Sequence, residues 1–444
     1  MAITKINAEA FVSLSKIHPV IDVRSEGEYQ HAHIPSAYSL PLFNNEERKV
    51  VGTAYKQQSR EAAIKIGLDF FGKKMRAMVE EVERLTDERS KKIYKKSSID
   101  PPENYPSKTV LIHCWRGGMR SGAVAWLLDL YGFKVYSLSG GYKAFRNWVL
   151  QQFEKEYNFR ILGGYTGSGK TYVLHELKNK GEKIIDLEKL ANHKGSAFGN
   201  IGFKPQPSQE MFENMLAVEL DDRCEMTDDG EKEDDRGQKS DDVKEEDQQV
   251  SNNSHLKISP PAREGTDFMR SIKSGVVKLS SLNSQVSIPN AQLQTTNHKL
   301  TSNSHQLSAP VWLEDESQRI GLVNIPNSLW KTMRQQPVYF LNINFEERLK
   351  HIVKEYGKAD KEKLVNAILR IQKRLGGLET KTALNFLVEN DVTECFRILL
   401  FYYDKQYEKA LKNRDVSAPL ITKVECEKVD AKENAKQLLH LNKH

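Results

Sequence analysis

The sequence lacks any apolar stretch long enough to cross a lipid bilayer. A membrane-spanning helix needs about 18 consecutive apolar residues, and no run in the 444 residues approaches that length. The opening segment, MAITKINAEAF, also lacks the apolar core of a secretory signal. Hydrophobic residues make up 39% of the chain and charged residues 28%, a composition typical of water-soluble proteins. We therefore expect a cytoplasmic protein with no membrane partner.

Cysteine is scarce as well. The four cysteines, Cys114, Cys224, Cys395 and Cys426, lie far apart and form no C-x-x-C pair. This spacing indicates neither a disulfide framework nor a structural zinc site. Each cysteine must therefore be interpreted in its own sequence context.

The middle of the chain lacks the apolar residues that a folded core requires. Between Asp221 and Asp247 there are 14 acidic and 5 basic residues, a local charge of −9, so the rest of a chain of net charge +6 carries +15. From Ser251 to Ser308 the sequence is rich in Ser, Asn and Gln and shows no sustained period. Such a segment cannot bury enough apolar surface to offset the entropy of ordering it. The pattern predicts a disordered, low-complexity insertion over 221–308, which is either a solvated loop or a regulatory or partner-binding segment.

Short apolar runs alternate with helical patterns on both sides of this insertion. The runs lie at residues 19–23, 109–112, 134–138, 158–162, 183–186, 310–313 and 337–341. This alternation is typical of a parallel sheet covered by helices. From Phe345 onward apolar residues recur every three or four positions, which predicts helices. We therefore expect two parallel-sheet α/β domains, at 1–150 and 158–345, the second interrupted by the insertion, and a helical C-terminal region at 346–444.

Cys114 stands between a strand pattern and a helical pattern, in the segment HCWRGGMRS. Backbone N–H groups at the start of a helix favour an anion, so we expect a lowered thiol pKa. Gly117 and Gly118 allow the backbone to wrap tightly around a bound group, and Arg116 and Arg120 add positive charge. The pattern predicts a nucleophile or sulfur-carrier site whose catalytic residues are Cys114, Arg116 and Arg120. The alternative is an ordinary buried cysteine at the end of a core strand.

A second loop, GYTGSGKT, matches the P-loop pattern G-x-x-x-x-G-K-[ST] and lies between a buried strand pattern and a helical pattern. Backbone N–H groups of such a loop hold a polyphosphate, and its lysine contacts the terminal oxygens. The expected phosphate-binding residues are Gly164, Gly167, Ser168, Gly169, Lys170 and Thr171. Thr171 is also a candidate ligand for Mg²⁺, although the sequence leaves the need for magnesium open and defines no certain metal site.

Three carboxylates, Glu314, Asp315 and Glu316, follow the apolar run at 310–313. Glu314 and Asp315 are candidates for the acidic partner of a magnesium ion or for a general acid or base. A charged strand end without a chemical role explains them equally well.

The first loop and its surroundings resemble two known families. The segment His113–Ser121 is similar to the phosphate-binding loop of cysteine phosphatases and to the active-site loop of rhodanese domains. The stretches 21–37 and 138–145 resemble the first and last rhodanese motifs. The resemblance implies a rhodanese-like domain in which Cys114 carries a sulfane sulfur or a selenium atom. We expect Asp22 and Arg24, a polar pair at a strand end, to brace the loop.

The order of the two loops resembles the tRNA 2-selenouridine synthase family over about 355 residues, the length left without the insertion. The matching stretches are 47–57, 113–121, 163–171, 186–199, 207–214, 312–321 and 400–407. The resemblance implies a transferase that replaces sulfur by selenium in the wobble 2-thiouridine of tRNA. Selenophosphate would be the selenium donor, and geranyl diphosphate would form an S-geranylated intermediate.

The same resemblance implies a division of labour between the loops. The P-loop around Lys170 would hold the diphosphate of geranyl diphosphate, Cys114 would take or present the selenium, and Arg116 and Arg120 would bind the anionic donor. No tightly bound cofactor is expected. A selenophosphate-producing enzyme is an expected partner.

The tRNA, contacted at its anticodon region, would bind to the basic part of the chain. The candidate contacts are Arg319, Lys331, Arg334, Arg370, Lys373 and Arg374. Each of these is also compatible with an ordinary solvated helix face. Tyr402 and Tyr403 either stack on an unpaired base or pack in a core.

Two other functional classes fit parts of the sequence. A P-loop kinase or NTPase fused to a phosphatase-like domain would contain both loops without acting on tRNA. A sulfur-relay or tRNA-binding adaptor would bind the same ligands without turnover.

Overall fold

The computed structural model describes residues 3–97, 108–221, 310–412 and 421–441, and all of these belong to one compact unit. The insertion expected at 221–308 lies, apart from Asp221, outside the described residues, as does Cys224. No helix of the described segments is both long enough and apolar enough to cross a membrane.

The first sheet has five parallel strands in the order β1-β5-β4-β2-β3. These are β1 (Thr4–Ile6), β2 (Val20–Asp22), β3 (Ala37–Ser39), β4 (Thr109–His113) and β5 (Lys134–Leu138). Successive residues of β4 point to opposite faces, so Val110 and Ile112 enter one core and Leu111 enters another. Both faces are therefore covered, as the unbroken apolar runs predict.

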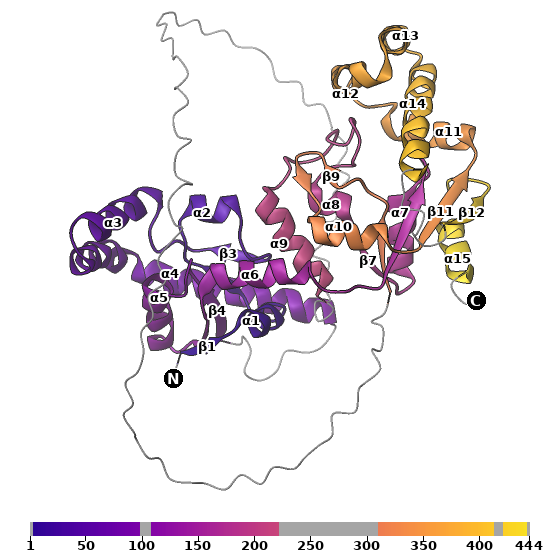
Figure 1. The fold of residues 1–444 in the computed structure, drawn as a ribbon. Coiled ribbons are helices and arrows are strands. Elements are labelled where there is room, and N and C mark those ends of the chain that lie inside the picture. Colours follow the sequence, from indigo (N-terminus) through magenta and orange to yellow (C-terminus); the bar gives the residue numbers. More distant parts are fainter. Residues whose placement is uncertain (1–2, 98–107, 222–309, 413–420, 442–444) are drawn as a thin grey trace, which may run out of the picture. The chain divides into compact units, whose positions relative to one another are not determined.

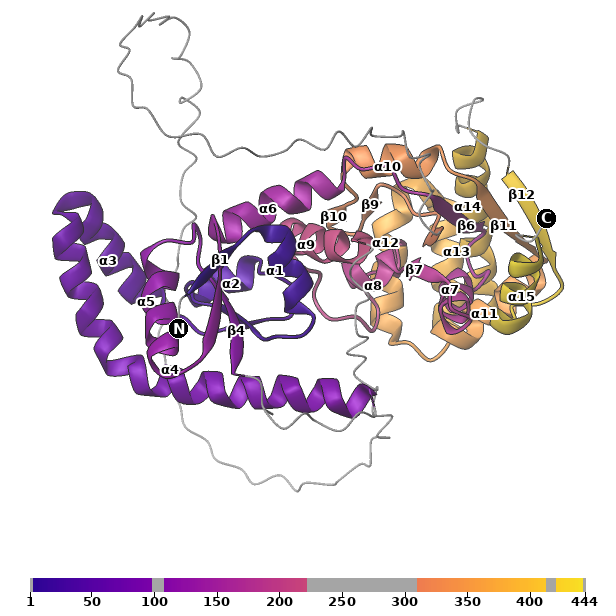
Figure 2. The ribbon, with the colours of Figure 1, turned by 90° about the horizontal axis from the view of Figure 1, so that it is seen from below.

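Helices cover both faces of this sheet (Figure 1). The core that contains Leu111 includes residues of α1 (Ala8–Ser15) and α6 (Gly141–Gln152). The opposite core includes residues of α4 (Arg60–Ser97) and α5 (Met119–Leu130). Two further helices are α2 (Glu26–His31) and α3 (Asn45–Gln57). Figure 2 shows the 38-residue α4 as one continuous helix.

The second sheet also has five parallel strands, in the order β12-β11-β6-β8-β7. These are β6 (Phe159–Gly164), β7 (Lys183–Ile185), β8 (Val311–Glu314), β11 (Val338–Ile343) and β12 (Ile421–Cys426). Helices α7 (Lys170–Asn179) and α15 (Ala431–Leu441) share a core on one face of it. Helices α9 (Gln209–Leu220) and α10 (Asn327–Arg334) cover the other. Smaller elements are α8 (Leu187–Ala191) and an antiparallel pair, β9 (Arg319–Ile320) and β10 (Val323–Asn324).

The C-terminal region is helical, as expected, and includes one strand that the sequence analysis did not anticipate. Helices α11 (Phe345–Tyr356), α12 (Lys361–Leu375), α13 (Gly377–Val388) and α14 (Val392–Lys412) build a core of their own. The unanticipated strand, β12, pairs with β11 at the edge of the second sheet. The expected fold class, two parallel-sheet α/β domains followed by a helical region, is confirmed.

Candidate functional site

The Cys114 loop connects β4 to α5, and the sulfur is buried within it. The residue is only 3% exposed, and its Sγ lies 3.2 Å from the hydroxyl of Ser121. Burial raises the pKa of the thiol, but hydrogen bonds from the Ser121 hydroxyl and from the backbone N–H groups of Ser121, Gly118 and Arg116 outweigh it. The net effect is a lowered pKa, which favours the thiolate.

Glycines allow this loop to pack against the first turn of α6. A Cβ on Gly141 (φ +60°) would lie 2.4 Å from the carbonyl oxygen of Cys114, and one on Gly117 (φ +64°) would lie 2.6 Å from that of Leu138. The positive φ angles also disfavour any residue with a side chain. The backbone N–H of Tyr142 donates to the Cys114 carbonyl at 2.8 Å. The loop is therefore fixed from α6 as well as from β4.

The two arginines expected to bind an anionic donor occupy different surroundings. Arg116 is exposed. Arg120 forms an ion pair with Glu28, with 2.8 Å between Nη1 and Oε2. The strongest contributions that lower the pKa of Cys114 come from hydrogen bonds to backbone and hydroxyl groups, not from guanidinium charge.

Asp22 and Arg24 form a fully buried pair at the end of β2. The Nη2 of Arg24 lies 2.6 Å from Oδ2 of Asp22 and donates to the carbonyl of Ala32 at 2.7 Å. The guanidinium lies 3.9 Å from the centre of the Tyr142 ring. Burial raises the pKa of Asp22, but its electrostatic interaction with His113 and the charge and hydrogen bonds of Arg24 bring it below its usual value. The pair thus contacts the residue whose backbone holds the Cys114 loop.

The P-loop connects β6 to α7, as predicted. Gly164, Gly167 and Gly169 all have positive φ angles, at +151°, +80° and +73°. A Cβ on Gly164 would lie 2.6 Å from Oγ of Ser168. That oxygen is buried and has no hydrogen-bond partner among the described residues. A buried, unsatisfied donor inside such a loop fits an anionic ligand.

The ammonium group of Lys170 lies near a backbone carbonyl and several acidic side chains. Its Nζ donates to the carbonyl of Gly164 at 3.1 Å and lies 5.4 Å from the centre of the Tyr407 ring. Burial lowers the pKa of Lys170, but Tyr407, Glu314, Glu316 and Glu188 raise it by more. The lysine is therefore protonated at neutral pH and available to a phosphate oxygen.

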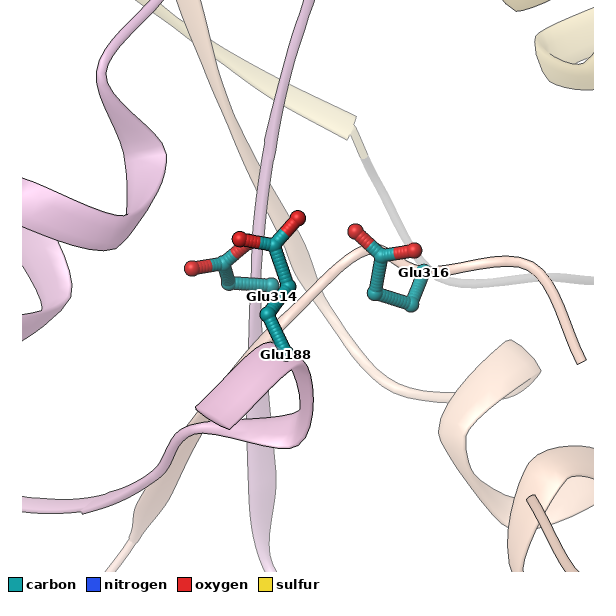
Figure 3. A group of neighbouring side chains, drawn as sticks. All are labelled: Glu188, Glu314 and Glu316. Carbon is teal, nitrogen blue, oxygen red and sulfur yellow. The ribbon is translucent and has the colours of Figure 1, made fainter. Parts of the chain in front are cut away.

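Three of the acidic side chains that act on Lys170 lie close to one another (Figure 3). Glu188 lies on α8 directly after β7, Glu314 ends β8, and Glu316 lies two residues further on. Their nearest carboxylate oxygens all lie within 4.8 Å of one another. The hydroxyl of Thr171 donates to Oε2 of Glu188 at 3.1 Å. This places the P-loop threonine against the carboxylate cluster.

The cluster has the chemistry of a site for a hard divalent cation. Burial is the largest effect on all three groups, and it raises the pKa of Glu188 and Glu314 and brings that of Glu316 to about 8. Oε1 of Glu314 is buried without a hydrogen-bond partner in the described part of the chain. Oxygen ligands of this kind suit Mg²⁺. Glu188, Glu314 and Glu316, with Thr171 beside them, are thus the residues that fit such an ion.

The two carboxylates predicted from the sequence separate in the structure. Glu314 joins the cluster, whereas Asp315 is not part of it and lies 3.6 Å from Nη1 of Arg334. Glu188 was missed, and Glu316, which follows the same apolar run, was not singled out. A carboxylate just after the apolar run at 183–186 was the signal for Glu188, because parallel neighbouring strands end at the same edge of a sheet.

The candidate tRNA contacts fall into two groups. Among those near β9 and α10, Arg319 donates to the carbonyl of Gly321, Arg334 pairs with Asp315 and Lys331 is exposed. Those on α12 are exposed, and Arg370 donates to Asn200 at 3.2 Å. Tyr402 is buried and Tyr403 accepts a hydrogen bond from the backbone of Ala197, so both pack in the core.

Lys373 belongs to a groove of about 540 Å³ between α12 and α13. Its lining residues are Leu369, Gln372, Lys373, Gly377, Thr380, Lys381, Leu384 and Asn385. Lys381 was not singled out from the sequence. Lys381 and Lys373 line the same groove only because α12 and α13 fold against each other, which the sequence spacing alone does not show.

Comparisons with known proteins agree with this architecture. The model of the rhodanese-like domain matches residues 7–147, and that of the tRNA 2-selenouridine synthase AAA domain matches residues 157–231 and 280–437. The chain is 42% identical over 206 residues to the tRNA 2-selenouridine synthase of Sulfurovum sp., covering 46% of this chain and 50% of that protein. It is 41% identical over 209 residues to the enzyme of that name from Hydrogenovibrio crunogenus, covering 45% and 52%. It thus matches about half the length of these relatives. Because the AAA-domain model covers more than half of the chain, the chain belongs to the tRNA 2-selenouridine synthase family.

Proposed function

We propose that the protein is a tRNA-modifying transferase that exchanges the sulfur of a wobble 2-thiouridine for selenium in two steps. In the first step, the sulfur of the base attacks C1 of geranyl diphosphate, and diphosphate leaves with the electrons of the C–O bond. In the second step, the selenium of selenophosphate adds to C2 of the base, water takes the phosphoryl group to give phosphate, and the geranyl thiolate leaves with the electrons of the C–S bond. The alkylated sulfur is the better leaving group.

The observation that carries this proposal is the presence of two chemically different anion sites in one chain. The P-loop offers glycine N–H groups, the buried Ser168 hydroxyl and a protonated Lys170, which suit a diphosphate leaving group. The other loop offers a buried sulfur with a lowered pKa, which suits selenium transfer. In this mechanism Cys114 and its loop present the selenium anion to C2, and the selenium keeps its oxidation state throughout. A selenophosphate-producing enzyme would supply the donor.

Magnesium has a place in the first step. Glu188, Glu314 and Glu316 would hold the ion beside Thr171, and the ion would supply charge neutralisation at the diphosphate. Lys170 then contacts the same leaving group from the P-loop side.

We place the tRNA backbone along the groove between α12 and α13. Lys373 and Lys381 line it, and Arg374 is the neighbour of Lys373 on α12. Positive side chains at a groove attract phosphates without reading sequence. Arg370 continues this basic surface along α12, whereas Arg319, Lys331 and Arg334 would form a separate contact.

Mass spectrometry of nucleosides from thiolated tRNA tests the proposal, with each donor supplied separately. Geranyl diphosphate alone should yield the S-geranyl nucleoside, and added selenophosphate should yield 2-selenouridine. Cys114→Ala should abolish selenation and preserve geranylation, and Lys170→Ala should remove geranylation. Turnover of ATP and of a phosphate ester, with unchanged tRNA, would instead support the kinase and phosphatase alternative. Tight tRNA binding without either product would support an adaptor.

A further inference from the structure

The side chain of Tyr142 links the Cys114 loop to a helix of the other sheet. Its ring is fully buried, and its hydroxyl donates to Oε1 of Glu210 at 2.7 Å and accepts from Nδ2 of Asn214 at 2.8 Å. Both partners lie on α9. The backbone N–H of the same tyrosine holds the Cys114 carbonyl at 2.8 Å. One residue thus contacts the thiolate loop through its backbone and α9 through its side chain.

Asn214 is fixed on both of its polar atoms. The side chain is fully buried; Nδ2 also donates to the carbonyl of His33 at 2.9 Å, and Oδ1 accepts from Arg146 at 2.6 Å. Arg146 pairs in turn with Glu213. An amide bonded in this way has one orientation, because rotation would leave buried donors and acceptors unpaired.

The same helix is built into the second sheet. Phe212 and Leu216 of α9 share a core with Ile185 of β7. The amide of Gln209 exchanges two hydrogen bonds with the backbone of Asn324, which lies on β10. The strand β7 leads directly to Glu188 of the carboxylate cluster. The contact of Asn214 with Tyr142 therefore connects the two candidate sites through a single helix.

We propose that Tyr142 and Asn214 are positioning residues for the selenium-transfer step, through which α9 holds the Cys114 loop in its anion-binding conformation. The role in turnover rests on the function proposed above, whereas the positioning itself does not. Loss of either hydrogen-bonding group would loosen the first turn of α6 and with it the N–H groups that stabilise the sulfur anion.

Alkylation of Cys114 by iodoacetamide tests the positioning. The rate is followed across pH by mass spectrometry of the peptide that contains Cys114, so that the other cysteines do not interfere. Relative to the unmodified protein, the midpoint of the profile should rise by about one pH unit in Tyr142→Phe and in Asn214→Leu, as the loop N–H groups move away from the sulfur. Tyr29→Phe is the matched control. It also removes a tyrosine hydroxyl, but this hydroxyl donates to the Ala37 carbonyl of the first sheet and not to α9. Its midpoint should not change.

The variants leave the charged groups around the sulfur in place. Those that face the loop or the contact with α9 are Asp22, Arg24, Glu28, His31, His33, His113, Arg116, Arg120, Arg146, Glu210 and Glu213. Burial lowers the pKa of His113, which is therefore neutral at neutral pH. A shift of the midpoint in an α9 variant thus reports loop geometry and not the removal of a charge.

Circular dichroism verifies that the variants fold. Folded variants would overturn the proposal if their alkylation midpoint equalled that of the unmodified protein. If Asn214→Leu does not fold, Asn214→Ala removes the amide without adding a charge, and its unchanged midpoint would have the same force. In the activity assay, Tyr142→Phe and Asn214→Leu should each slow selenation about tenfold at neutral pH. Each should change the rate of geranylation by less than twofold. An unmodified protein that does not selenate would refute the proposed function, while the alkylation profiles would still decide the positioning.

Discussion

Cys114 is stabilised as an anion by neutral donors, and Lys170 as a cation by acidic neighbours. The first arrangement uses the Ser121 hydroxyl and loop N–H groups, and the second uses Glu188, Glu314 and Glu316. An anion that binds at either loop, selenium at the first or phosphate at the second, replaces some of the polar contacts that the loop makes by itself. The chemistry of each loop therefore depends on a few atoms around it.

Removal of magnesium should slow the first step. Treatment with EDTA should reduce geranylation about a hundredfold, and added Mg²⁺ should restore it, because the diphosphate leaves with its charge neutralised. Glu314→Gln should abolish Mg²⁺ binding in isothermal titration calorimetry. Glu362→Gln, an exposed residue of α12, is the control and should bind the ion normally. Full activity in EDTA would contradict the cation site.

The buried pair of Asp22 and Arg24 should dominate the stability of the first sheet. Arg24→Leu should lower the free energy of unfolding by about 3–5 kcal/mol in urea titrations, since it leaves a buried carboxylate unpaired. Arg76→Leu breaks an exposed pair with Glu80 and should leave the free energy of unfolding nearly unchanged. Equal effects of the two substitutions would show that burial of the pair is unimportant.

The same pair has a defined pH dependence. The pKa of Asp22 is lower in the folded protein than in the unfolded chain, so its contribution to stability is present above the unfolded value. The contribution is lost as the pH falls through the folded pKa. The difference in unfolding free energy between the unmodified protein and Asp22→Asn should accordingly shrink in acid.

At the scale of elements, seven strands of the two five-stranded sheets could be predicted, and the edge strands β1, β3 and β12 could not. The seven apolar runs correspond to β2, β4, β5, β6, β7, β8 and β11, and all of these except β7 are mostly buried. In β12 exposed and buried residues alternate, with only Val424 and Cys426 buried. A short edge strand among helices carries too weak a pattern to be recognised.

The carboxylate cluster could likewise be predicted only in part from the sequence. Glu188 and Glu314 are far apart in the sequence and meet because β7 and β8 are parallel neighbours. A single sequence does not state the order of strands in a sheet. Glu314 was accessible to sequence reasoning because it directly follows an apolar run, whereas Glu316 depends on the path of the following loop.

The turn between β5 and α6 should be intolerant of side chains. Gly141→Ala would place a Cβ against the Cys114 carbonyl, so we expect Cys114 to lose its low-pH reactivity with iodoacetamide. Gly132→Ala is the matched control, because Gly132 also has a positive φ, +100°, but no heavy atom lies within 4 Å of its Cβ position. It should lose some stability and keep the reactivity. Normal alkylation of Gly141→Ala would show that the packing is not needed.

Charge reversal in the α12–α13 groove should weaken tRNA binding. Lys373→Glu and Lys381→Glu should each lower affinity at low salt and reduce the slope of log K against log salt by about one, because each lysine releases a counterion. Lys432→Glu, an exposed position on α15, is the control. Fluorescence anisotropy with labelled tRNA measures all three. An unchanged slope of log K against log salt in the groove variants would show that the tRNA does not bind at this groove.

At the scale of the whole molecule, the two sheets share one apolar core. Phe145 and Val149 of α6 belong to the same cluster as Phe212 and Leu216 of α9, and this cluster continues to Ile161 of β6. Buried apolar contact between elements couples their stability. The sequence predicts the two α/β domains but not this shared core, since nothing in the residues themselves states which helix faces meet.

The shared core predicts one unfolding transition for both sheets. Pulsed hydrogen exchange in urea should show residues 109–113 and 159–164 losing protection at the same midpoint. Leu216→Ala should lower both midpoints together, at a cost of about 2–5 kcal/mol. Two separate midpoints would show that the sheets unfold independently.

The strand order of the second sheet also has a consequence for synthesis on the ribosome. β6 lies between β11 and β8, and both follow it in the chain, β8 only after about 150 further residues. At a synthesis rate of about 5–20 residues per second, β6 and its glycine loop wait on the order of 10–30 s for the first neighbouring strand, β8. All strands of the first sheet have been translated by then. The nascent chain thus completes its sulfur loop first, although the proposed chemistry uses that loop last.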